Sequence, residues 1–173
     1  MAVWKSQFDR MLRGLSKVET HEADRILQVD DIYHFFQDCW HLKDWIKNDA
    51  TLSQSIRAGI ISEAEKTDSL NYCADLANGS KHLKLDHARK GVALWRFDTT
   101  QSNSDRSTMT ITKHSADDEV LADKTANGGE GIITTTHYVL ASPQGTPFGG
   151  PVGLARRAVQ DWKDLLEKHG LQI

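Results

Sequence analysis

The feature that most constrains the fold of this chain is an apolar seam between residues 30 and 48. Its members recur in steps of three and four: Ile32, Phe35, Cys39, Leu42 and Ile46. That spacing puts them on one face of a helix, which Phe36 and Trp40 widen. Asp30 and Asp31 suit the first turn, where an acidic side chain can cap free amides and meet the helix dipole. We therefore expect a helix over 30–48 with its seam in the core.

Similar periodicity predicts further helices on both sides of this seam. The expected ranges are 2–15, 52–66, 67–86 and 152–169, with 19–29 continuing or restarting the first. Thr51 or Ser53 suits the N-cap of the second range, and Gly170 is the expected stop of the last one. The last helix should bury an apolar face made of Leu154, Ala155, Ala158, Val159, Trp162, Leu165 and Leu166.

The residue pattern changes near Gly91, where helical periodicity ends and threonine-rich stretches with alternating apolar and polar residues begin. These stretches predict strands at 92–99, 107–114, 119–125 and 132–141, followed by a glycine- and proline-rich loop over 142–153. The fold class is therefore mainly α, α+β overall. We expect a four- or five-helix bundle with a small antiparallel β-sheet inserted before the C-terminal helix. A single domain should span 1–173, divided into a helical bundle (1–90), a β-rich insertion (91–142) and a closing helix (152–170).

Charge and cysteine content limit the classes of function. The net charge of −3 argues against broad, sequence-independent binding to the nucleic-acid backbone. This argument does not rule out a local basic groove that binds nucleic acid. The chain has no apolar run of signal-peptide or membrane-spanning length, which predicts a cytoplasmic protein without a membrane partner. Cys39 and Cys73 lie among apolar or small neighbours and are expected to be core residues in a reducing compartment, with a disulfide as the alternative.

Two predicted helices carry a polar stripe beside the apolar seam. The first stripe consists of His34, Asp38, His41 and Asn48, and the second of Asn71, Asp75, Asn78 and His82. If the helices pack antiparallel, the stripes could meet, and a histidine beside a carboxylate suits proton transfer near neutral pH. The alternative is that each stripe is the solvated shoulder of an amphipathic helix. The sequence leaves both interpretations open.

A metal site is a third interpretation of the same residues. Asp38 and His41 are three positions apart and His82 and Asp86 four apart, so each pair could reach one ion. The glutamate-rich pattern of a di-iron bundle is missing, and we expect no metal and no cofactor. The loop before the last helix lacks the lysine ending of a P-loop.

Three stretches together carry a resemblance: "FFQDCWHLKDWI", "CADLANGSKHLKL" and "LARRAVQDWKDLLEKHGL". They resemble uncharacterised small bacterial helical proteins whose layout is similar to the HEPN superfamily. Many HEPN proteins are metal-independent ribonucleases of toxin–antitoxin and anti-phage systems, and they often work as dimers. HEPN ribonucleases typically carry an arginine, four to six intervening residues and then a histidine on a late helix, and no arginine and histidine here have that spacing.

By this resemblance the catalytic set would be His82 as general acid or base, Lys81 as the charge partner of a phosphate and Asn78 as an orienting group. His41 and Asp44 would line the substrate-binding surface. The expectation is a HEPN-like bacterial cytoplasmic protein that binds or cleaves RNA. The rival is a non-enzymatic bundle that binds a protein partner or forms a homodimer.

Overall fold

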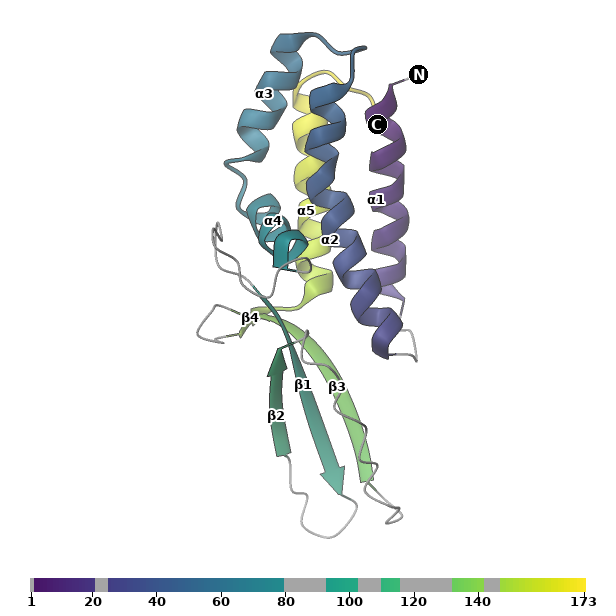
Figure 1. The fold of residues 1–173 in the computed structure, drawn as a ribbon, viewed down its shortest axis with the longest axis vertical. Coiled ribbons are helices and arrows are strands. Elements are labelled where there is room, and N and C mark those ends of the chain that lie inside the picture. Colours follow the sequence, from purple (N-terminus) through teal and green to yellow (C-terminus); the bar gives the residue numbers. More distant parts are fainter. Residues whose placement is uncertain (1, 21–24, 80–92, 103–109, 116–131, 142–146) are drawn as a thin grey trace. The chain divides into compact units, whose positions relative to one another are not determined.

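The computed structural model describes residues 2–20, 25–79, 93–102, 110–115, 132–141 and 147–173 (Figure 1). The chain divides into two compact units, residues 1–92 with 151–173 and residues 93–150. The described part of the first unit contains α1 (Val3–Glu19), α2 (Arg25–Asn48), α3 (Gln54–Ala64), α4 (Asp68–Gly79) and α5 (Pro151–Lys168). The prediction of a mainly helical chain is confirmed. The end of the predicted 67–86 helix lies outside the described residues.

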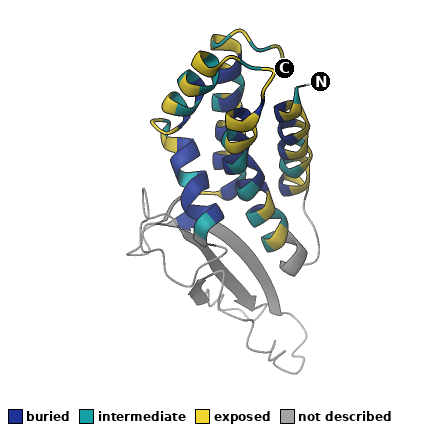
Figure 2. Cartoon of the chain, turned by 45° about the horizontal axis from the view of Figure 1, so that its top comes forward, coloured by how far each residue is buried: buried dark blue, intermediate teal, exposed yellow. Residues whose placement is uncertain are grey.

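The apolar seam of α2 forms the centre of the helical unit. Ile32, Phe35, Cys39, Leu42 and Ile46 are all at most 2% exposed, as is Trp162 of α5. Figure 2 shows the buried surfaces of the helices turned inward and the exposed ones outward. The predicted core is therefore confirmed, and Cys39 and Cys73 are buried free thiols within it.

The predicted start of α2 is wrong. The helix begins at Arg25, so Asp30 and Asp31 lie in its interior rather than in its first turn. Asp31 instead receives a hydrogen bond from Lys17 of α1, with 3.4 Å between Nζ and Oδ1. The helix reaches further because residues 25–29 contain neither proline nor glycine to stop it.

Local signals explain how α3 begins and how α5 ends. The Ser53 hydroxyl accepts a hydrogen bond from the Ile56 amide at 3.3 Å, so Ser53 is the N-cap of α3. After α5, Gly170 adopts a φ of 76°, which is left-handed backbone that glycine tolerates. The Leu171 amide then donates to the Leu166 carbonyl at 2.9 Å, as in a Schellman turn. Every residue predicted for the apolar face of α5 is buried.

The N-terminus of α1 is capped by a residue far away in the sequence. Ala2 offers no side-chain cap, but the Asp49 carboxylate accepts a hydrogen bond from the Trp4 amide at 3.1 Å. It also accepts from the Thr51 amide at 2.9 Å. Asp49 is 1% exposed. Burial raises the pKa of Asp49, but hydrogen bonds from Thr51, Trp4 and Val3 outweigh this effect and hold the pKa below its ordinary value.

Replacing Asp49 with alanine should lower the free energy of unfolding at neutral pH by about 2 kcal/mol, because the buried Trp4 amide and the Thr51 amide lose their acceptor. The lowered pKa means that this stabilisation is complete above the unfolded-state value of 3.8 and is lost as the pH falls through the folded-state value. Urea unfolding of parent and Asp49→Ala at about pH 5 and about pH 2.5 measures the difference. Asp49→Asn is the matched control, since it keeps an acceptor. A parent–alanine difference that is equal at both pH values would contradict this role.

The second unit contains the four-stranded antiparallel sheet, in the order β2-β1-β3-β4. Its strands are β1 (Ala93–Ser102), β2 (Thr110–Ser115), β3 (Ile132–Ala141) and β4 (Pro147–Gly149). β1 and β3 pair along their whole length, from Ala93 opposite Ala141 to Ser102 opposite Ile132. β4 falls inside the stretch expected to be a loop. The expected strand 119–125 lies outside the described residues.

Candidate functional site

The two helices that carry the polar stripes pack on each other. The sulfur atoms of Cys39 on α2 and Cys73 on α4 lie 3.7 Å apart. Lys43, further along α2, forms a 3.6 Å ion pair with Glu65. The Glu65 carbonyl in turn accepts a hydrogen bond from the Asn71 side chain at 3.1 Å, which places Glu65 beside the beginning of α4. These contacts place α4 against the middle of α2, with the residue Glu65 before α4 beside Lys43.

Within the stripe on α2, Asp38 contacts α1. Arg10 donates to its Oδ1 from Nε at 2.8 Å and also from Nη2, and this hydrogen bond raises the pKa of Arg10. The Gln7 amide donates to the Asp38 carbonyl at 2.9 Å and to Oδ1 at 3.3 Å. Asp38 and Gln7 are 8% and 1% exposed. The Asp38 carboxylate therefore links α1 and α2 through hydrogen bonds and an ion pair.

The stripe on α4 is largely buried. Asn71 and Asp75 are 7% and 1% exposed, so this side of α4 is not the solvated shoulder that one interpretation of the sequence expected. The Asn71 side chain donates to the Glu65 carbonyl just before the helix. Buried polar groups are stable only when they are hydrogen-bonded, and the bond from Asn71 fixes the segment that leads into α4.

The predicted site residues are distributed along the α2–α4 pair. His41 and Asn78 are half-buried, while Asp44 is exposed and its carbonyl accepts a 2.8 Å hydrogen bond from Asn48. His41 and Asp44 follow Cys39, and Asn78 follows Cys73. Lys81 and His82 lie outside the described residues.

Metal ligation was one interpretation of Asp38, His41, His82 and Asp86. Asp38 is occupied by Arg10 and Gln7, and His82 and Asp86 lie outside the described residues. In the part of the chain that the structure describes, no group of three or more histidine, cysteine, aspartate or glutamate side chains could hold an ion.

Sequence patterns missed a set of polar contacts around Cys39 and Cys73. The Trp162 indole nitrogen donates to the Cys39 carbonyl at 3.0 Å. The Ser69 hydroxyl donates to the Asp161 carboxylate, which joins the beginning of α4 to α5. Burial, with smaller contributions from Cys39 and Asp161, raises the pKa of the Cys73 thiol well above its ordinary value. The sequence held one signal of these contacts, the predicted core residue Trp162, because a buried indole N–H needs a hydrogen-bond acceptor.

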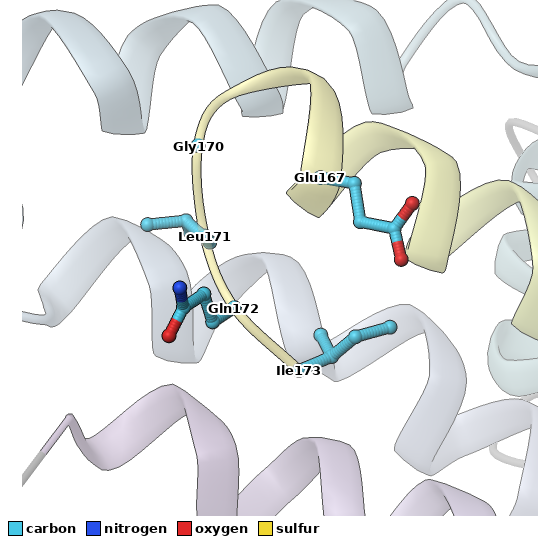
Figure 3. A pocket seen from close by; sticks show the side chains of 5 residues that line it. All are labelled: Glu167, Gly170, Leu171, Gln172 and Ile173. Carbon is cyan, nitrogen blue, oxygen red and sulfur yellow. The ribbon is translucent and has the colours of Figure 1, made fainter.

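A shallow, open pocket lies elsewhere on the helical unit, where the chain continues past α5 (Figure 3). It is lined by Glu167, Gly170, Leu171, Gln172 and Ile173. The pocket contains none of the predicted site residues, and Glu167 is its only ionisable side chain. The α2–α4 pair therefore remains the candidate functional site.

No protein-family model, curated protein or solved structure matches the chain. Among the described residues, no helix is both long enough and apolar enough to cross a membrane.

Proposed function

We propose that the chain is a HEPN-like bacterial protein that binds RNA along the α2–α4 helix pair and cleaves it without a metal ion. The observation that supports this proposal is the packing of the two helices that carry the polar stripes, with the sulfur atoms of Cys39 and Cys73 in contact. His41 and Asn78 on these helices are half-buried, as expected for groups that meet a ligand beside a packed core. The superfamily that the sequence resembles suggests a toxin or anti-phage setting.

The proposed chemistry needs a proton acceptor, a positive charge and an orienting group. His82 takes the proton of a ribose 2′-hydroxyl, whose oxygen attacks the adjacent phosphorus as the 5′-oxygen leaves. Protonated His82 then returns the proton to the leaving oxygen. Lys81 neutralises charge on the phosphate oxygens, and Asn78 orients the phosphate by hydrogen bonding. The products are a 2′,3′-cyclic phosphate and a 5′-hydroxyl.

Replacing Lys81 with alanine should weaken RNA binding more at low salt than at high salt, because the contact to phosphate is electrostatic and is screened by ions. The slope of log affinity against log salt should fall in magnitude by about 0.7 for a single-stranded RNA if one phosphate contact is lost. Titration of a labelled RNA at several salt concentrations measures both quantities. Lys66→Ala, which removes an exposed lysine before α4, is the matched control.

Three outcomes of this titration matter. Loss of affinity in Lys81→Ala with normal binding by Lys66→Ala supports a local phosphate contact. Equal losses of affinity in both variants would show that RNA responds to the general charge of the protein and not to a local contact with Lys81. No measurable binding by the parent protein at low salt would reject RNA as the ligand.

A second candidate is a non-enzymatic bundle that binds a protein partner or a second copy of itself. It is favoured by the structural use of the polar stripes, since Asp38 is tied to Arg10 and Gln7, and Asn71 to the Glu65 carbonyl. Sedimentation over a range of concentrations tests the homodimer. A monomer at every concentration would remove it.

A further inference from the structure

The contact between Cys39 and Cys73 joins two helices that are distant in the sequence. The residues are 34 positions apart, and their sulfur atoms are 3.7 Å from each other. Both are free thiols, and both are 0% exposed. A disulfide bond is about 2.05 Å long, so the sulfur atoms need to approach by less than 2 Å to become bonded. Side-chain rotation and a small shift of one helix can supply a movement of this size.

The surroundings of the pair hold it in place on three helices, α2, α4 and α5 (Figure 1). The Trp162 indole donates to the Cys39 carbonyl, and Ser69 of α4 donates to Asp161 of α5. Each cysteine therefore lies next to a hydrogen bond between helices. Two thiols held in contact in this way have a high effective concentration toward each other, which favours an internal disulfide over reaction with an outside thiol.

Burial also determines which reagents can reach the pair. The raised pKa keeps the Cys73 thiol protonated at neutral pH, and a thiol is a much weaker nucleophile than a thiolate. The sulfur atoms have no exposed surface for a bulky oxidant such as a peptide disulfide. Oxidation should therefore be slow and should require a small, uncharged oxidant.

We propose that Cys39 and Cys73 are a redox modification site that forms a reversible disulfide between α2 and α4 with hydrogen peroxide as the oxidant. One sulfur attacks a peroxide oxygen, the O–O bond breaks, and a sulfenic acid and one water form. The second sulfur attacks the sulfenic sulfur and releases another water. The two thiols lose two electrons and two protons, and the peroxide is reduced to two waters. This site is separate from the proposed RNA chemistry and does not depend on it.

The cross-link should stabilise the helical unit. It closes a long loop that contains α3, which removes conformational freedom from the unfolded chain. For a chain of this size, a disulfide over such a loop should raise the Tm by roughly 5–15 °C. Reduction should return the Tm to its starting value.

The test is treatment of the native full-length chain with hydrogen peroxide, followed by blocking of free thiols and intact mass spectrometry. The expected product has lost two hydrogen atoms, carries no blocking group, contains a Cys39–Cys73 peptide and reverts with dithiothreitol. Its Tm should be higher than that of the reduced protein. Cys39→Ser and Cys73→Ser are matched controls, and neither should form the product or gain stability.

Three results would overturn the proposal. The first is a native protein whose two cysteines remain free after prolonged treatment, while urea-unfolded protein forms the bond. The second is oxidation of one cysteine to sulfinic acid without a cross-link. The third is a disulfide that joins two chains, seen as a dimer on a non-reducing gel.

Discussion

Phe35→Ala should lower the free energy of unfolding by about 3–5 kcal/mol, because it removes a large side chain from a packed core and leaves a cavity. Phe35 is 0% exposed and packs edge-to-face with Phe36, with 5.3 Å between ring centroids. It also contacts α1, where a Cβ added to Gly14 would lie 3.5 Å from the Phe35 ring. The ring therefore stabilises both α2 and the α1–α2 contact.

Urea unfolding followed by circular dichroism measures this loss. Trp45→Ala is the control, because Trp45 lies on the same helix but is 39% exposed, and its loss should cost less than about 1 kcal/mol. A cost below about 1 kcal/mol for Phe35→Ala would place the ring outside a tightly packed core.

His82→Ala should reduce RNA cleavage by a factor on the order of 10²–10⁴, which is the usual contribution of a positioned general acid or base. The Tm should change little, because the residue is proposed to act on the substrate. Single-turnover cleavage of a labelled RNA and a thermal melt measure both properties. His34→Ala is the matched control, since His34 is exposed on α2. A large fall in Tm with no change in cleavage would assign His82 a structural role.

Much of the helical unit could be predicted because burial along one helix repeats with the helical period. The α2 seam and the apolar face of α5 are both of this kind, and each predicted member is buried. Ser53 and Gly170 could be predicted because a cap depends on a few neighbouring residues. The start of α2 could not be predicted, because Asp30 and Asp31 also suit the first turn of a helix. The sequence does not reveal that Lys17 of α1 contacts Asp31.

The polar contacts between helices could not be predicted in the same way. Asp38 binds Arg10 across 28 residues of sequence, and Asp49 binds the Trp4 amide across 45. Such pairs depend on how two helices are aligned in space, which the period of one helix does not encode. The alignment also decides which members of the stripes meet. The sequence places Asp44 and Asn78 in one site, but the angle at which α2 and α4 cross at the contact between Cys39 and Cys73 is not encoded in the period of either helix.

Incubation of the purified full-length protein with mixed RNA, with and without a chelator, tests the proposed function most directly. We expect cleavage that survives chelation and leaves 2′,3′-cyclic phosphate ends, because His82, Lys81 and Asn78 supply the chemistry without a metal ion. Intact RNA under both conditions, or cleavage that is lost with chelator and restored by a divalent ion, would contradict the proposal of a metal-independent ribonuclease.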